Sequence, residues 1–288
     1  MTNVYKGLDQ ETLDREYNAR ATVDDADAYI QEYAERSAAA REALPCLQDV
    51  PYGPHEDMVV DLFPAGRGTP VFVYIHGGYW RALSQKHSAF MAPAFVERGI
   101  SVVAVNYSLA PEASLDTIVR QCRDCLGWVW KHGAKALDVD PDRIFVGGSS
   151  AGGHLTGMMV AGGWHEQLDV PEDLVKGAIS FSGLHDLEPI RLSNINEWAR
   201  LDEASAARNS PVHHLPERGC PLIVTVGELE TSEFKRQAKL FADAWDGMGF
   251  PVSHFEVAGC NHFDIVFDLC DPVSRVARDL FTMIGVET

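Results

Sequence analysis

No apolar run in this sequence is long enough to cross a membrane. The continuous apolar stretches fall far short of the roughly 20 residues that a membrane-spanning helix needs. The start of the chain, Met-Thr-Asn-Val-Tyr-Lys, lacks the charged and apolar regions of a signal peptide. Internal repeats and low-complexity segments are absent as well. We therefore expect a cytoplasmic protein with no membrane partner.

Basic residues are scarce relative to acidic ones. The chain has 24 Lys and Arg against 42 Asp and Glu, which gives a formal net charge of −18. Nucleic acids and anionic membranes attract basic patches, so the charge argues against both as partners. The acidic residues are scattered without long runs, and we assign them to solubility. We expect a small-molecule partner and leave open a homodimer.

Cysteine is also sparse, with 6 residues in 288. A disulfide scaffold needs a far higher density, so free thiols are expected. Cys122 and Cys125 have the C-x-x-C spacing of redox and metal sites, but they fall within an expected helix, 114–132, which favours packing. His165 is not followed by the second histidine of a helical zinc motif. We therefore expect neither a metal nor a cofactor.

What the sequence does contain is a glycine-rich turn with two serines. Residues 147–153, Gly-Gly-Ser-Ser-Ala-Gly-Gly, follow a short apolar run and precede an expected helix. Such a turn alone can also pack a helix on a sheet or bind a phosphate. In the G-x-S-x-G pattern, however, the serine lies on a strained turn that exposes its hydroxyl. Read strictly, the pattern is Gly148-x-Ser150-x-Gly152, so Ser150 is the candidate nucleophile and Ser149 a turn residue.

A second glycine-containing loop lies upstream of this turn. The apolar run 71–75 has the length and residue types of a buried strand and ends in His76-Gly77-Gly78-Tyr79-Trp80. Acyl transfer passes through a tetrahedral oxyanion, which backbone N–H groups can stabilise. The candidate oxyanion donors are Gly77, Gly78, Tyr79 and Ala151, the residue after the nucleophile. The candidate substrate-binding residues are Tyr79, Trp80 and Ser149, although the two aromatic residues can equally serve packing.

After residue 56, strand and helix patterns alternate along the chain. This alternation is typical of a mostly parallel sheet covered by helices on both faces. The expected strands are 58–63, 71–75, 101–106, 144–147, 175–181, 222–226 and 252–257. The expected helices are 88–98, 114–132, 150–160, 233–247 and 263–284. The sequence therefore predicts an α/β fold.

The first 55 residues have a different composition. They are rich in Ala, Glu, Asp, Arg and Tyr, and no strand pattern begins before Met58. We expect residues 1–55 to form an N-terminal helical extension that either docks on the core or caps the active site, and residues 56–288 to form the catalytic α/β domain. A second insertion, 184–215, is a candidate for the pocket wall, because loops of this length are usually functional or disordered.

A serine nucleophile needs a histidine base. His262 lies in a loop directly after the last expected strand and before the closing helix. His213 and His214, in a proline-flanked loop, lack this position. His262 is therefore the candidate base.

The histidine in turn needs a carboxylate partner, and the loop after strand 222–226 offers three. Glu230 lies four residues past Val226, within the usual reach of a triad acid, and is favoured. Glu228 is the runner-up. Glu233 fits the start of the next helix, where its charge suits the helix dipole.

Together these motifs resemble the kynurenine formamidase (arylformamidase) branch of the α/β hydrolases, close to the hormone-sensitive-lipase-like carboxylesterases. Residues 76–80 resemble the HGGxW motif of the family, and 148–152 its GxSxG motif. Further similar segments are 13–18, 106–112, 182–187 and 227–237, so the resemblance spans nearly the whole chain. The acid of the family is usually aspartate, and Glu230 stands there with one more methylene.

The resemblance implies an α/β-hydrolase fold and cofactor-free hydrolysis through an acyl-enzyme. The implied substrate is an N-formylkynurenine-type or other N-acyl arylamine. A broad-specificity carboxylesterase acting on short-chain esters is the alternative. A non-catalytic ligand-binding protein of the same fold is disfavoured, because such proteins often lose a triad member and every member has a candidate here.

Overall fold

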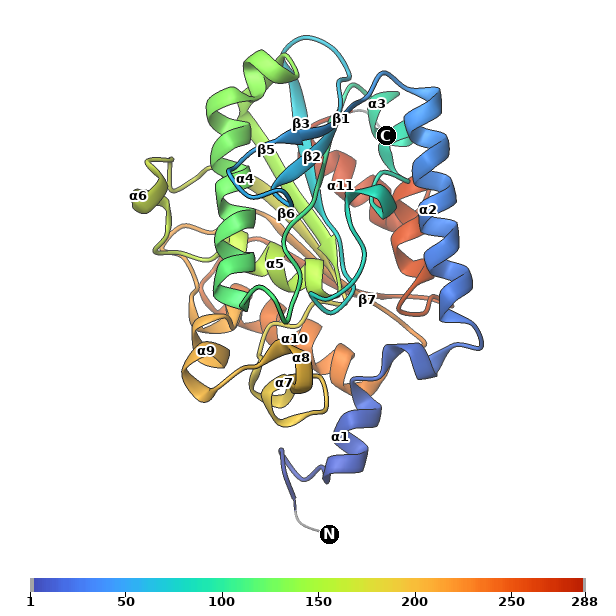
Figure 1. The fold of residues 1–288 in the computed structure, drawn as a ribbon, viewed down its shortest axis with the longest axis vertical. Helices are drawn as coiled ribbons and strands as arrows, with labels where there is room; N and C mark the ends of the chain where they lie inside the picture. Colours follow the sequence, from blue (N-terminus) through green and yellow to red (C-terminus); the bar gives the residue numbers. More distant parts are fainter. Residues whose placement is uncertain (1–2, 287–288) are drawn as a thin grey trace.

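One eight-stranded sheet runs through the centre of the molecule, in a computed structural model that describes residues 3–286 (Figure 1). The strand order is β1-β2-β4-β3-β5-β6-β7-β8. β1 and β2 pair antiparallel, as do β2 and β4, and the remaining pairs are parallel. The strands are β1 Leu47–Pro51, β2 Val59–Phe63, β3 Thr69–Ile75, β4 Ser101–Val105, β5 Val139–Ser149, β6 Val175–Phe181, β7 Leu222–Gly227 and β8 Val252–Val257.

Helices cover both faces of this sheet. The elements are α1 Gln10–Glu16, η1 Ala19–Thr22, α2 Ala26–Ala43, η2 Gln85–His87, α3 Ala92–Val96, α4 Leu115–Ala136, α5 Ala151–Val160, α6 His165–Leu168, α7 Glu188–Leu192, α8 Asn196–Ala199, α9 Glu203–Arg208, η3 Pro211–His213, α10 Ser232–Gly247, η4 Asp264–Cys270 and α11 Arg275–Ile284. In Figure 1, α4 lies on one side of the sheet, and α2, α3 and α11 lie on the other. The α/β class predicted from the sequence, with its mostly parallel central sheet, is confirmed.

The central strands are continuous apolar runs because both of their faces are covered. In β3, every residue from Pro70 to Ile75 is buried, and all five residues of β4 are buried. The helices begin at side-chain caps: Ser114 accepts a hydrogen bond from the backbone of α4, and Ser274 from that of α11. β3 and β5 pair along their lengths, so that Ile75 lies opposite Gly148. This register brings the ends of the two motif-bearing strands together.

Two sequence-based expectations about these elements are wrong. A strand does precede Met58: β1 adds an edge to the sheet, and its residues are mostly exposed, which removes the buried pattern of a central strand. The single helix expected over 263–284 is two helices, η4 and α11, separated near Pro272. Proline lacks the N–H that a continuing helix would need.

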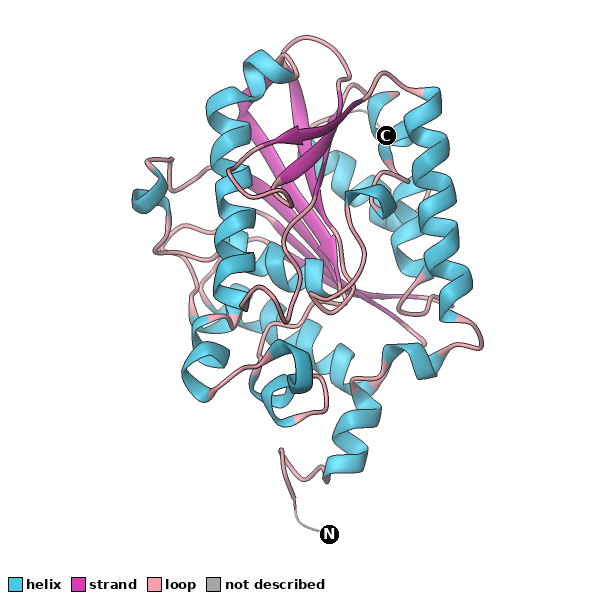
Figure 2. Cartoon of the chain, viewed as in Figure 1, coloured by secondary structure: helices cyan, strands magenta, loops and turns pink. Residues whose placement is uncertain are grey.

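The insertion 184–215 forms short helices joined by loops, α7, α8, α9 and η3, which Figure 2 shows beyond one end of the sheet. α1 and α2 provide the helices expected in the N-terminal segment. Of the two domain ranges, residues 1, 2, 287 and 288 lie outside the described part of the chain. Among residues 3–286, no helix has the length and apolar character to span a bilayer.

Candidate active site

Ser150 occupies the sharp turn between β5 and α5. Its backbone has φ 59° and ψ −117°, a conformation that a residue with a Cβ rarely adopts. Its N–H donates to the Phe181 carbonyl at 2.8 Å, and its own carbonyl accepts from His154 N–H at 2.9 Å. The turn is thus fixed by β6 on one side and by α5 on the other, which is the strained nucleophile turn that the sequence pattern predicts.

The two glycines of this motif are required by close backbone contacts. A Cβ placed on Gly152 would lie 2.0 Å from the Ile75 carbonyl oxygen. A Cβ on Gly148 would lie 2.4 Å from the Gly152 carbonyl oxygen. Any larger residue at either position would push the turn away from the end of β3.

Glu230 and His262 meet in a short hydrogen bond. His262 Nδ1 lies 2.6 Å from Glu230 Oε2, and both side chains are almost fully buried. The other carboxylate oxygen, Oε1, accepts from the Ser182 hydroxyl at 2.5 Å and from Gly227 N–H at 2.7 Å. With its Nδ1 proton directed to the carboxylate, His262 keeps Nε2 available as a base.

The other two glutamates of the loop have different partners. Glu228 is exposed and accepts from Gly259 N–H at 2.7 Å. Glu233 forms an ion pair with Arg236 at 2.9 Å. Of the three, Glu230 is the one that bonds to His262.

Ser150 and His262 line a single cavity of about 170 Å³. An engineered cavity of about 150 Å³ in another protein holds benzene, so this space suits one aromatic ring with small substituents. The cavity lies next to the upstream glycine loop, which contributes Gly77, Gly78 and Tyr79 to its wall. Ser149 lines it too. Apolar and aromatic side chains complete the wall, among them Ile30, Tyr33, Tyr74, Leu83, Phe90, Phe263 and Val266.

The upstream loop has three successive residues in the left-handed region. Gly78 has φ 93°, Tyr79 φ 49° and Trp80 φ 59°. A Cβ on Gly78 would lie 2.3 Å from the Ala82 carbonyl oxygen, so this position requires glycine. In residues 3–286, the N–H groups of Gly77, Gly78 and Tyr79 donate no backbone hydrogen bond. Ala151 is the first residue of α5, where N–H groups have no acceptor within the helix. These four N–H groups therefore stay candidates for the oxyanion donors.

Trp80 takes a different place from its neighbours. Its side chain is fully buried and does not line the cavity. The indole N–H donates to His154 Nδ1 at 3.2 Å, and His154 Nε2 in turn donates to the Asn209 carbonyl at 2.7 Å. Trp80 thus packs beneath the loop and joins it to α5 and the insertion. Its position gives no support to the expected contact with substrate.

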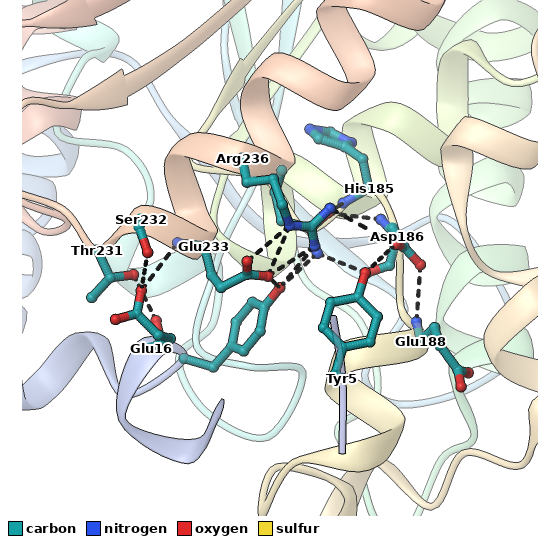
Figure 3. A network of polar contacts seen from close by, with 11 residues as sticks. Tyr5, Glu16, His185, Asp186, Glu188, Thr231, Ser232, Glu233 and Arg236 are labelled. Atoms are coloured by element: carbon teal, nitrogen blue, oxygen red, sulfur yellow. Dashed lines mark hydrogen bonds and ion pairs between the residues drawn. The ribbon is translucent and has the colours of Figure 1, made fainter. Parts of the chain in front are cut away.

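Sequence reasoning missed the part that the first helix plays around this site. The Tyr79 hydroxyl donates to the Tyr17 carbonyl at 2.6 Å. Thr231 Oγ1 donates to the Glu16 carbonyl at 2.6 Å, and the Glu16 carboxylate accepts from Ser232 Oγ at 2.7 Å. Figure 3 shows Glu16 facing residues 231–233, directly after the triad acid. The end of α1 therefore binds both the upstream glycine loop and the loop that carries Glu230.

Helix α2 makes corresponding contacts with the loop that carries the base. The Tyr33 hydroxyl donates to the Phe263 carbonyl. Asn261 Nδ2 donates to the Tyr29 hydroxyl at 3.0 Å. The Tyr29 and Phe263 rings stack with centroids 5.7 Å apart. Both chain neighbours of His262 are thus held by α2.

The described residues contain no group of three or more His, Cys, Asp or Glu side chains arranged to hold a metal ion. Cys122 and Cys125 are buried in α4, and burial raises the pKa of the Cys122 thiol.

Comparisons with known proteins agree with this geometry. Residues 72–263 match the family described as the alpha/beta hydrolase fold. The chain is 32% identical to a kynurenine formamidase of Danio rerio, an alignment that covers 98% of each protein, and 30% identical to that of Salmo salar over the same shares.

Solved structures show the same architecture. A thioesterase candidate from Silicibacter sp. TM1040 superimposes with a TM-score of 0.81 at 29% identity, over 92% of this chain and 97% of the other. An esterase of Pyrobaculum calidifontis superimposes with a TM-score of 0.69 at 19% identity, over 96% of this chain and 95% of the other, and indicates the fold alone.

Proposed function

Because the chain belongs to the α/β-hydrolase family, in the branch that contains the kynurenine formamidases, it is a hydrolase, and we propose that it cleaves small aryl formamides and amides through an acyl-enzyme on Ser150. The observation that carries this proposal is the short Glu230–His262 hydrogen bond beside the cavity that Ser150 lines. The relatives named as kynurenine formamidases support the aryl formamide class. Hydrolysis of short-chain esters is the second candidate, supported by a relative named as an esterase in Mycobacterium tuberculosis that is 27% identical over an alignment covering 83% of this chain.

The first half of the reaction forms the acyl-enzyme. Nε2 of His262 accepts the Ser150 hydroxyl proton as Oγ attacks the substrate carbonyl carbon, and Glu230 stabilises the resulting imidazolium. N–H groups of Gly78, Tyr79 and Ala151 bind the tetrahedral oxyanion. Each such donor contributes about 3 kcal/mol to transition-state stability. The imidazolium then protonates the leaving amine nitrogen as the C–N bond breaks.

The second half releases the acid. Water enters, and His262 removes its proton as the oxygen attacks the acyl carbon of the Ser150 ester. The tetrahedral intermediate collapses, and the proton on His262 passes to Ser150 Oγ as the C–O bond breaks. The products are the free arylamine and the carboxylic acid, which is formic acid for a formamide substrate. No further reactant is required.

We also propose that residues 1–55 cap the catalytic domain, 56–288. Ala19, Arg20, Ile30 and Tyr33 of this segment line the same cavity as Ser150, which supports a cap that closes part of the substrate space. Ser149 and Tyr79 are the substrate contacts that this cavity supports best. A cytoplasmic location and a homodimer remain predictions, and size-exclusion chromatography with light scattering tests the dimer.

A substrate panel tests the function. Wild-type protein and Ser150→Ala are assayed with N-formylkynurenine, formanilide and p-nitrophenyl acetate. We expect formamide turnover in the wild type and its loss in the variant. Brisk ester turnover with negligible formamide turnover would select the carboxylesterase. Turnover of none of the three would overturn the proposal.

A further inference from the structure

The cavity wall has charges of only one sign. Arg20 and Arg81 line the cavity together with histidines, and within residues 3–286 no Asp or Glu lines it. This is a local exception, since the whole chain has 42 acidic residues and a net charge of −18. Both arginines are exposed, which places them where the cavity opens to solvent. A charged substrate group entering here meets two guanidinium groups, of which that of Arg20 is paired with the exposed Asp27.

The Arg81 guanidinium is held in a defined place. Its central carbon lies 3.6 Å from the centroid of the Trp198 ring. The Trp198 indole N–H donates to the Tyr79 carbonyl at 3.1 Å, so the ring is fixed to the loop that supplies the oxyanion donors. A guanidinium stacked by its face keeps its N–H edge free for a planar anion. The stack therefore orients Arg81 for a ligand beside the catalytic loop.

Arg81 also lacks a competing anion of its own. Among the described residues, no carboxylate lies within 4.0 Å of its guanidinium. Arg20, by contrast, pairs with Asp27 at 2.5 Å, and the two side chains are 53% and 80% exposed. Such exposed pairs are weak and exchange readily with solvent. Arg81 is thus the primary charge at the opening, and Arg20 the secondary one.

We propose that Arg81, assisted by Arg20, forms an anion subsite, and that the substrate is an aryl formamide or ester whose aryl part bears a carboxylate. This inference rests on the proposed function and narrows its substrate class. Arginine recognises carboxylates through paired N–H groups.

Aryl acetates that differ in the charge of the para substituent test this effect. Phenyl acetate, 4-acetoxybenzoate and the 4-trimethylammonio analogue differ in charge, and each kcat/KM is divided by the rate constant of alkaline hydrolysis to remove leaving-group effects. For the wild type we expect this normalised kcat/KM to be highest for the anionic ester, intermediate for the neutral ester and lowest for the cationic ester. The ratio of normalised kcat/KM for the anionic ester to that for the neutral ester should fall as NaCl rises to 0.5 M, because salt screens exposed charges. The screening length shortens from about 10 Å at 0.1 M salt to about 3 Å at 1 M. Formanilide and 2-formamidobenzoate provide the matching amide pair.

Charge variants identify the residue responsible. Arg81→Gln should lower the anionic-to-neutral ratio about fivefold or more, mainly through KM, and Arg20→Gln should lower it less. Arg67→Gln is the matched control, because Arg67 is 92% exposed in the turn before β3 and is not part of the cavity wall. It removes the same charge and should leave the ratio unchanged. The subsite is overturned if the wild-type ratio does not respond to salt, or if Arg81→Gln and Arg67→Gln behave alike.

The proposed function is judged separately within the same experiment. If the wild type hydrolyses phenyl acetate briskly and Ser150→Ala does not, the proposal of a hydrolase that acts through Ser150 is supported. If that result is obtained and the anionic-to-neutral ratio is the same in the wild type and in Arg81→Gln, only the anion subsite is overturned. Absence of wild-type turnover on every substrate overturns the hydrolase and with it the subsite.

Discussion

The carboxylate of Glu230 accepts hydrogen bonds from three directions, namely from Ser182, Gly227 and His262. These bonds fix both of its oxygens, so the longer glutamate side chain is held as firmly as a shorter acid would be. The bond to Nδ1 sets the tautomer of His262 and leaves Nε2 for proton transfer. At the scale of residues, the role proposed for Glu230 as the triad acid rests on this fixed geometry.

Replacing the acid should therefore cost far more than replacing its neighbour. Glu230→Gln removes the charge that stabilises the imidazolium, and we expect kcat to fall about 10³-fold to 10⁴-fold. Glu228→Gln is the matched control in the same loop and should change kcat by less than about twofold, in line with exposed substitutions away from a site. Steady-state kinetics on the better formamide or ester substrate measures both. A large loss in Glu228→Gln with little in Glu230→Gln would assign the acid to Glu228.

Motif spacing is sufficient to identify the candidates Ser150 and His262, because each lies in a short loop directly after a strand. The acid was harder to choose, since three glutamates share one loop and spacing alone left Glu228 open. Ser182 could not be assigned from sequence, because its contact with Glu230 joins the ends of two strands that are far apart in the chain. The same holds for Arg81 and Trp198, which meet only in the folded molecule.

At the scale of elements, α2 holds the loop of the catalytic base. Tyr33 bonds to Phe263, and Tyr29 bonds to Asn261 and stacks on Phe263. α2 thus contacts the residues on both sides of His262. Since small displacements of a catalytic group are costly, we propose that this helix positions His262 as the base.

Tyr33→Phe tests that role by deleting one hydroxyl. We expect kcat to fall about threefold to tenfold with a smaller change in KM, because the base loop loses one anchor. Tyr5→Phe is the control, since the Tyr5 hydroxyl donates to Asp186 at 3.0 Å and not to the loop of His262 (Figure 3). Each variant loses about 1 kcal/mol of unfolding free energy. Equal kcat in the two variants would reduce Tyr33 to a purely structural residue.

Most elements follow from local patterns. The expected strands 175–181 and 252–257 have the bounds of β6 and β8, because turn residues flank each apolar run. β1 was missed because Gln48 and Asp49 interrupt its pattern at an exposed edge. The contacts of α1 and α2 with the catalytic loops could not be predicted, because tyrosines at helical spacing indicate a buried face but not the surface that it meets.

At the scale of the whole molecule, the alternation of strands and helices was sufficient to predict the α/β class. Folding also buries histidines that bear no catalytic role. Burial lowers the pKa of His76 to about 4 and that of His154 to about 4, from an ordinary value of 6.5. His76 stacks on Tyr107 with centroids 4.1 Å apart, and His154 Nδ1 accepts a hydrogen bond from the Trp80 indole N–H. Both side chains are neutral in the folded protein.

This burial makes stability depend on pH. Between pH 6.5 and 4 the unfolded chain binds protons that these folded side chains do not, so stability present above pH 6.5 is lost as pH falls. Each histidine contributes a loss of about 2 to 3 kcal/mol by pH 4.5. Urea unfolding of wild type at pH 7 and 4.5 measures the total. His154→Gln, which keeps a donor and an acceptor but does not titrate, should show a smaller loss. An equal loss in both proteins would contradict the role of His154.

The central claim is that Ser150 is the nucleophile activated by His262 and Glu230. Labelling with a fluorophosphonate, followed by peptide mass spectrometry, tests it without knowledge of the substrate, because the probe reacts only with an activated serine. The account predicts one adduct, on Ser150, that is absent in Ser150→Ala and strongly slowed in Glu230→Gln. An unlabelled native protein, or an adduct on a different serine that persists in Ser150→Ala, would contradict it.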